Sequence, residues 1–172
     1  FERASAFRIK IMHEILKLGI PISISVTAEA GLFSAVSIMI GTLGAIITSA
    51  NQIALNVITV TFMVPLAISA ATTVKVGQSL GEADRVKARD YALTGVFICG
   101  LFMLISSCIL LLLRGSIIDI YTGNIEIKDL AMSLLLVAAV FQIVDGIQIG
   151  AAGALRGYKD TKIPMIVNLF SY

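Results

Sequence analysis

The chain has 172 residues, of which 58% are hydrophobic and 14% are charged. Soluble domains average roughly 45–50% apolar and about 25% charged residues, so this composition excludes an ordinary soluble fold. The net charge of +2 is small, and the basic residues occur in short clusters between apolar runs. Nucleic-acid binding, which needs a basic face, therefore has little support.

Four apolar stretches are long enough to cross the hydrocarbon layer of a membrane, which takes roughly 20 helical residues. In chain order they run from about Leu18 to Ile40, Ile53 to Val74, Tyr91 to Leu113 and Leu130 to Leu155, and a fifth begins at Ile163. The pattern predicts an all-α fold, a polytopic membrane helix bundle with four transmembrane helices and the start of a fifth. Because the first residue is not Met and the last residues open another apolar segment, we expect residues 1–172 to be an internal fragment of a longer membrane domain.

Two prolines and one connector lead to further predictions about these helices. Pro21 is expected in the first turn of the first helix, where a missing N–H costs no hydrogen bond. Pro65 lies near the middle of the second helix, where it should produce a kink. The Val76–Asp90 connector is expected to be a turn followed by an amphipathic lead-in to the third helix. A solvated loop is the simpler interpretation of this connector, and a partner-binding site is the alternative.

The basic residues lie almost entirely on one side of this topology. Only Arg114 and Lys128 fall on the other side. The remaining eleven of the 13 lie before the first helix, between the second and third, or after the fourth, and they are Arg3, Arg8, Lys10, Lys17, Lys75, Arg85, Lys87, Arg89, Arg156, Lys159 and Lys162. By the positive-inside rule these three regions face the cytoplasm. We therefore predict a multi-pass protein of the cell membrane, with the N-terminus of the fragment in the cytoplasm.

Two of the eleven acidic residues fall well inside the apolar stretches. Glu29 lies about 16 Å along the first helix from Leu18, and Asp145 lies about 15 Å from Leu155, at 1.5 Å per residue. Both distances start from the predicted cytoplasmic side, so both carboxylates should lie near the bilayer midplane. A charge at that depth costs at least about 2.5–3.5 kcal/mol, and such residues normally mark an ion or substrate path.

Polar residues accompany both carboxylates. Gln142 and Gln148 lie three residues before and after Asp145, and Phe33 lies one turn after Glu29. The first turns of the second helix carry Gln52 and Asn56. For Glu29 and Asp145 the alternative to a transport role is interhelical hydrogen bonding that only holds the bundle together. For Gln52, Asn56 and Gln142, interhelical packing and the lining of a substrate cavity are equally supported.

Carboxylates in a desolvated site suit the binding of a monovalent cation. Na⁺ or H⁺ neutralises the site in one conformation, and competition or a change of cavity shape then releases a second substrate. A cation gradient would drive this exchange without ATP, and the sequence has no phosphate-binding glycine loop. We expect no cofactor other than the coupling ion, Na⁺ or H⁺.

The sequence gives little support to an enzyme. His13 is the only histidine and is expected to be an ordinary interfacial residue, because no Cys or carboxylate cluster accompanies it to form a metal site. No nucleophile with a plausible base is visible. Cys99 and Cys108 lie more than two helical turns apart in one stretch and cannot pair with each other.

One long segment of the fourth stretch has a distinctive motif. It runs as Phe141-Gln142-Ile143-Val144-Asp145-Gly146-Ile147-Gln148 and continues as Gly153-Ala154-Leu155-Arg156-Gly157-Tyr158-Lys159-Asp160-Thr161-Lys162. This segment closely resembles the multidrug and toxic compound extrusion (MATE) transporters of the NorM type. Agreement elsewhere includes Leu18-Gly19-Ile20-Pro21, Gln52-Ile53-Ala54-Leu55-Asn56, Pro65 with Ala67 and Ala70, and Val76-Gly77 with Leu80-Gly81. The resemblance implies that the four spans are helices seven to ten of a twelve-helix transporter with two six-helix lobes, and that helix eleven starts at Ile163.

The resemblance also implies roles for individual residues. Glu29 and Asp145 match the family's helix-seven glutamate and helix-ten aspartate, which serve the cation site. Phe33 and Gln52 match positions near the bound cation or drug. Phe141 is a departure, because some relatives carry a tyrosine there whose hydroxyl could coordinate the ion.

We therefore predict a cation-coupled antiporter that exports amphipathic or cationic drugs by alternating access. Its expected partners are organic drug-like substrates, the lipid bilayer and the N-terminal lobe of the same transporter. A lipid-linked saccharide flippase of the same superfamily is one alternative, although no Lys or Arg lies inside a predicted span. A non-transporting membrane subunit that uses the two carboxylates only for packing is another.

Overall fold

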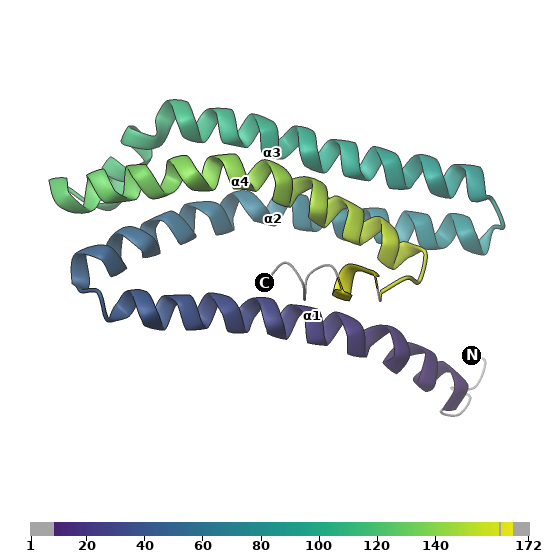
Figure 1. Cartoon of the computed structure of the whole chain (residues 1–172). Coiled ribbons are helices and arrows are strands. Elements are labelled where there is room, and N and C mark those ends of the chain that lie inside the picture. Colours follow the sequence, from purple (N-terminus) through teal and green to yellow (C-terminus); the bar gives the residue numbers. More distant parts are fainter. Residues whose placement is uncertain (1–8, 162, 167–172) are drawn as a thin grey trace, which may run out of the picture.

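The computed structural model of the chain describes residues 9–161 and 163–166, and all of its regular structure over these residues is helical (Figure 1). Four long helices follow one another along the chain: α1 (Ile9–Gly41), α2 (Ala45–Gly81), α3 (Arg85–Tyr121) and α4 (Ile125–Gly157). A short fifth helix covers residues 163–166. All four long helices are long and apolar enough to cross a membrane, so the predicted all-α fold with four spans and the start of a fifth is confirmed.

The helices are longer than the apolar stretches that reveal them. They contain 33 to 37 residues, which at 1.5 Å per residue is about 50–55 Å, whereas the hydrocarbon layer is about 30 Å thick. The expected place of Pro21 is therefore wrong. α1 begins at Ile9, so Pro21 lies inside the helix and not in its first turn. Hydropathy measures how much of a helix is apolar, and it does not detect helical turns that continue beyond the membrane.

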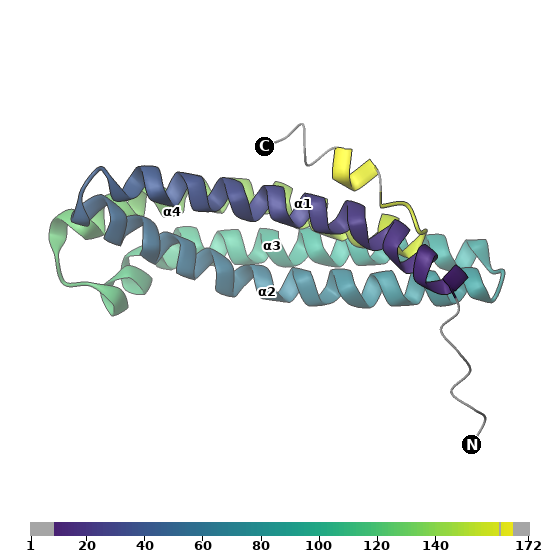
Figure 2. The ribbon, with the colours of Figure 1, turned by 90° about the horizontal axis from the view of Figure 1, so that it is seen from below.

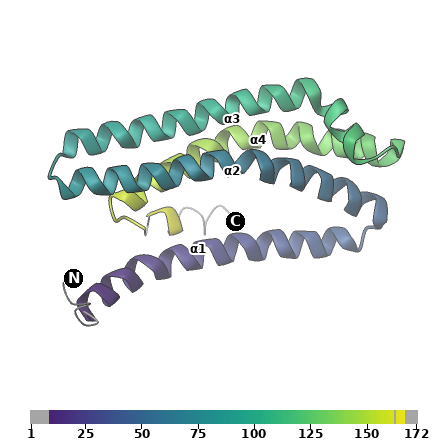
Figure 3. The same cartoon turned by 180° about the vertical axis from the view of Figure 1, so that it is seen from behind.

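Pro65 lies inside α2, and α2 remains one continuous helix. Figures 1 and 3 show that α2 changes direction part-way along its length. This course agrees with the expected bend, because a proline removes one backbone hydrogen bond and its ring crowds the preceding turn.

The connection between α2 and α3 is much shorter than the Val76–Asp90 connector expected from the sequence. α2 continues to Gly81 and α3 starts at Arg85, so only Glu82, Ala83 and Asp84 lie outside the helices. Ala83 has a φ of 60°, which lets the chain reverse within three residues. The expected length of the loop is therefore wrong, although its three residues are exposed, and the expected helical lead-in to the third span is present as the first turns of α3.

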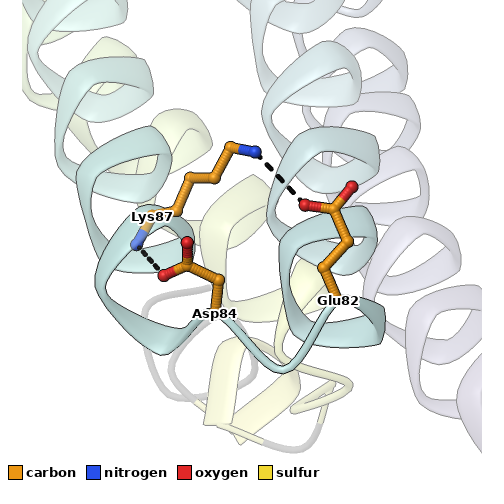
Figure 4. A network of polar contacts seen from close by, with 3 residues as sticks. All are labelled: Glu82, Asp84 and Lys87. Atoms are coloured by element: carbon orange, nitrogen blue, oxygen red, sulfur yellow. Dashed lines mark hydrogen bonds and ion pairs between the residues drawn. The ribbon is translucent and has the colours of Figure 1, made fainter.

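Polar contacts hold this turn (Figure 4). The Asp84 carboxylate caps α3 by accepting a 2.9 Å hydrogen bond from the Lys87 backbone N–H. The Lys87 ammonium also lies 3.2 Å from a carboxylate oxygen of Glu82. At the opposite end of the molecule, Asn124 caps α4 through the Glu126 N–H at 2.9 Å, and Asp119 pairs with Lys128.

Helices α2, α3 and α4 pack against one another and form what we call the three-helix unit (Figures 1 and 2). Glycines allow the close approach. A Cβ added at Gly150 of α4 would lie 2.9 Å from the Cα of Val96 in α3, and one at Gly153 would lie 2.6 Å from the carbonyl oxygen of Ser69 in α2. Contacts this short between backbones require residues without a side chain, which is the usual means of helix association in membranes.

α1 is different, because it is joined to the unit mainly near its own C-terminal end. Among the four long helices, no Cα of α1 lies within 8 Å of one in α3 or α4, and its close backbone contacts are with α2. Figures 1 and 3 show α1 diverging from α2 away from the turn that connects them. Cβ atoms added at Gly19, Gly31 or Gly41 would meet nothing within 4 Å.

The up-and-down connectivity brings three chain regions to one end of the molecule. These regions are the start of α1, the α2–α3 turn and the end of α4 (Figure 1). They are the regions in which the sequence places its basic clusters, whereas Arg114 and Lys128 belong to the opposite end. Several of the basic residues, among them Arg3, Arg8 and Lys162, fall outside the described residues.

Candidate cation site

Asp145 lies on an exposed flank of α4. Gly146, its neighbour, faces α3, since a Cβ there would lie 2.5 Å from Met103 Cγ. Ile147 also faces α3, because its Cγ1 lies 3.2 Å from the position of a Cβ added at Gly100. Side chains two positions apart in a helix differ by about 200° around the axis. Asp145 lies two positions before Ile147 and therefore points away from α3. Its carboxylate is thus carried by the three-helix unit but is not enclosed by it.

Glu29 lies on the partly buried face of α1. The partly or fully buried residues between positions 18 and 29 recur at helical spacing and define what we call the covered face, formed by Leu18, Gly19, Pro21, Ile22, Ser25, Ala28 and Glu29. Ser25, one turn before Glu29, is only 6% exposed. Glu29 therefore points toward the rest of the chain, whereas most of α1 is exposed.

The structure keeps the two carboxylates on separate helices that do not meet. Because no Cα atom of α1 lies within 8 Å of one in α4, the Cα atoms of Glu29 and Asp145 are more than 8 Å apart. Each lies four residues, about 6 Å, from the centre of its 33-residue helix, Ser25 in α1 and Phe141 in α4. Glu29 is displaced toward the α1–α2 turn and Asp145 toward the basic end.

The aromatic residues next to the carboxylates are also exposed. Phe33, one turn after Glu29, is 49% exposed, and Phe141, one turn before Asp145, is 64% exposed. Large apolar side chains on a membrane-spanning helix face either lipid or another part of the protein. Each of the two helices thus carries an exposed aromatic residue one turn from its carboxylate, Phe33 next to Glu29 on α1 and Phe141 next to Asp145 on α4.

The polar residues of α2 lie near its N-terminal end. Gln52 and Asn56 are both exposed. The Asn56 amide oxygen accepts a 3.0 Å hydrogen bond from the hydroxyl of Tyr121 at the end of α3. This contact fixes one end of the three-helix unit, and it gives Asn56 a packing role at the end of the bundle.

The two glutamines of α4 have different environments. Gln148 is half-buried. Gln142 is 2% exposed, and both polar atoms of its amide lack a hydrogen-bond partner among the described residues. The structure thus places Gln142 inside the three-helix unit, while Asp145, three residues later, lies on its surface. An unpaired buried amide is unfavourable in an apolar interior, so it is an exception that the packing of α4 tolerates.

Sequence reasoning missed the hydroxyl groups that join α4 to its neighbours. Ser69 of α2 donates to the carbonyl oxygen of Ile149 at 2.7 Å, and Thr73 donates to that of Gly153 at 2.8 Å. Ser107 of α3 donates to the carbonyl oxygen of Ala139 at 2.5 Å. Serines and threonines in an apolar stretch carry no periodic signal of their own, although their preference for interhelical contacts was a usable hint.

The described residues hold no group of three or more His, Cys, Asp or Glu side chains placed to bind a metal ion. Cys99 is buried, Cys108 is exposed, and neither is in a disulfide. His13 is exposed in α1. The acidic groups that remain within the spans are single carboxylates, each of which can bind a proton or contribute one ligand to a monovalent cation.

Comparison with known proteins identifies the family. The MatE family model matches residues 21–172. A probable multidrug resistance protein NorM of Xanthomonas campestris is 44% identical over 165 residues, which cover 96% of this chain and 36% of the relative. A multidrug resistance protein NorM of Burkholderia vietnamiensis is 42% identical over 177 residues, covering 100% of this chain and 38% of the relative.

A third relative, the multidrug resistance protein NorM of Aliivibrio fischeri, is 38% identical over 164 residues, covering 95% of this chain and 35% of the relative. The chain therefore spans little more than a third of the length of the curated relatives it matches. The match begins at residue 21 and ends at residue 172, so it includes the second part of α1, all of α2, α3 and α4, and both carboxylates. This chain belongs to the MatE family, a family of membrane transporters and not of enzymes.

Proposed function

We propose that this chain contributes the cation site to a transporter that exports amphipathic or cationic drugs in exchange for Na⁺ or H⁺. The observation that carries the proposal is the pair of carboxylates near the centres of two transmembrane helices, Glu29 on α1 and Asp145 on α4. Charged groups at such positions are costly unless they bind something, and the family membership supplies the class of substrate.

The mechanism follows from the difference between the two helices. Asp145 is carried by the tightly packed three-helix unit, and Glu29 is carried by α1, which packs only against α2. A cation that binds either carboxylate removes its charge, and a change in the position of α1 alters the cavity between them. Release of the drug on one side and of the cation on the other then completes an alternating-access cycle.

The proposal includes the surroundings of the chain. The N-terminal lobe of the same transporter would face the exposed flank of α4 and complete the cavity with Phe33, Gln52 and Gln148. The end that carries the α2–α3 turn would lie in the cytoplasm, because the described basic residues Lys75, Arg85, Lys87, Arg89 and Arg156 belong to that end. The protein would be a multi-pass protein of the cell membrane.

The decisive experiment uses the full-length transporter with Asp145→Asn. We expect cation-driven drug efflux from cells or proteoliposomes to be abolished, because the amide cannot exchange a proton or balance a cation. Asp129→Asn is the matched control, since Asp129 is an exposed acid at the start of the same helix. Normal efflux by Asp145→Asn would refute the proposal, whereas normal efflux by Asp129→Asn is required by it.

The coupling ion is determined by a second measurement. Drug flux into proteoliposomes is followed with a Na⁺ gradient at constant pH and, separately, with a pH gradient without Na⁺. Flux that responds to one gradient identifies the ion. Flux that responds to neither, in a preparation that still binds drug, would contradict cation coupling.

A further inference from the structure

We infer that Ser69 of α2 and Ser107 of α3 are positioning residues for Asp145, because they hold the backbone of α4 on both sides of it. This inference deepens the proposed function and rests on it. The carbonyl oxygen that Ser107 binds belongs to Ala139, six residues before Asp145, and the one that Ser69 binds belongs to Ile149, four residues after it.

The direction of these hydroxyl groups distinguishes them from hydroxyls that donate only within their own helix. A serine or threonine in a helix commonly donates to a carbonyl one turn earlier in its own helix. Ser34, Thr59 and Ser133 do so, with distances of 2.8, 2.7 and 3.1 Å to Ala30, Leu55 and Asp129. Ser69 and Ser107 donate instead to α4, and both are only 2% exposed.

The steric contacts act over the same part of α4. A Cβ at Gly146 would lie 2.5 Å from Met103 Cγ, and one at Gly150 would lie 2.9 Å from the Cα of Val96. A Cβ at Gly153 would lie 2.3 Å from the Ser69 hydroxyl itself. The stretch from residue 139 to 153 is therefore held by the Ser107 hydrogen bond near its start, by the Ser69 and Thr73 hydrogen bonds near its end, and by close backbone packing between them.

This arrangement fixes where the Asp145 carboxylate can be. Its own carbonyl accepts the helical hydrogen bond from the N–H of Ile149, the residue whose carbonyl Ser69 binds. If the hydroxyl of Ser69 is removed, α4 can rotate or shift relative to α2 by a fraction of an ångström. Cation binding depends on ligand positions at that scale, so a looser Asp145 binds the cation less tightly.

The test measures cation affinity separately from maximal flux in the full-length transporter. Ser69→Ala and Ser107→Ala are compared with Ser133→Ala, a serine of α4 that bonds only within its own helix among the contacts seen here. Drug flux per folded transporter is measured against Na⁺ concentration and against pH. We expect each positioning variant to raise the half-saturating cation concentration about 3- to 15-fold, the range that one interhelical hydrogen bond supports, with maximal flux nearly unchanged.

Ser69→Cys provides a rescue, because a thiol has similar volume and remains a weak donor. Its half-saturating concentration should fall between those of the wild type and Ser69→Ala. Unchanged cation dependence in both alanine variants, or an equal shift in Ser133→Ala, would overturn the inference. A loss of maximal flux with no change in half-saturation would also overturn it, because that result indicates a purely structural role.

The outcome is separable from that of the proposed function. If the wild-type transporter responds to neither cation gradient, the proposed function fails. If it responds and the serine variants behave as the wild type, only the positioning role fails.

Discussion

α1 and α4 are helices of equal length, each with one carboxylate near its centre, yet they are held in very different ways. α4 packs against both α2 and α3, and its glycines bring backbones into contact. Among the four long helices, α1 has close backbone contacts with α2 only, and a Cβ added at any of its three glycines would meet no atom within 4 Å. Apolar composition therefore makes both helices membrane-compatible, but the spacing of small residues decides which one becomes part of a tightly packed unit.

The comparison also separates two kinds of carboxylate. Asp145 belongs to the three-helix unit, whose shape is fixed by close contacts between helices. Glu29 belongs to α1, which makes few close contacts with the other helices. Tightly packed elements move as rigid bodies, so a change in the distance between the carboxylates would come from α1. Three predictions test this contrast, in order of decreasing expected effect.

The largest effect is expected from a pair of Gly→Ala substitutions in the full-length protein. Gly153→Ala places a Cβ 2.6 Å from the Ser69 carbonyl oxygen, which cannot move without displacing α2, so it should lower the free energy of unfolding by about 1–3 kcal/mol. Gly31→Ala should be neutral or stabilising by up to about 1 kcal/mol, because alanine favours the helix and the site is open. Thermal unfolding in detergent measures both.

Opposite signs for these two substitutions would confirm that α4 is tightly packed and α1 is not. An equal loss of stability from Gly31→Ala would break the comparison, since it would mean that α1 is packed in the whole transporter as closely as α4. Drug binding by the purified variants shows whether each retains its fold.

A smaller effect is expected inside the three-helix unit at Gln142. Gln142→Met preserves the length of the side chain and removes two buried polar atoms that have no partner among the described residues. We expect the free energy of unfolding to rise by about 1 kcal/mol, because a buried unpaired amide is destabilising. Thermal unfolding measures the change, with Gln78→Met, an exposed glutamine of α2, as the control. A fall in stability would show that the amide has a partner in the membrane, such as a bound water.

The smallest effect is expected at the end of the unit. Tyr121→Phe removes the hydroxyl that donates to Asn56, and it should lower the free energy of unfolding by about 0.6 kcal/mol, the mean for an interhelical hydrogen bond in a membrane. Asn56→Ala combined with Tyr121→Phe should cost less than the sum of the single changes. Strict additivity would mean that the two side chains do not interact, and that Asn56 is free for the cavity-lining role.

Much of the fold could be predicted from hydropathy. The number of spans, their order and the clustering of basic residues at one end follow from runs of about 20 apolar residues and from the charges between them. The exact ends could not be predicted in this way. The turns before Leu18 and after Val74 lie outside the most apolar residues but continue their helices, because backbone hydrogen bonds extend a helix at little cost.

The candidate site was predicted only as a set of residues. Glu29 and Asp145 stand out because charge is rare inside an apolar stretch, and their motif resembles the MATE pattern. Their relative position could not be derived, since it depends on how α1 packs, and apolar composition does not specify which helix α1 packs against. Gln142 shows the same limit. It lies three residues from Asp145, yet one side chain is buried and the other is exposed.

The sequence by itself determined that this chain has four helices long and apolar enough to cross a membrane, that most of its basic residues fall in three connecting regions, and that two carboxylates interrupt the apolar stretches. Each of these depends on local composition, which the primary structure states directly. Only the tertiary structure decided that Ser69 and Ser107 bind the backbone of α4, that Gln142 is enclosed, and that α1 remains apart from α3 and α4. These features depend on distances between helices, and such distances are set by the fit of whole surfaces and not by any single residue.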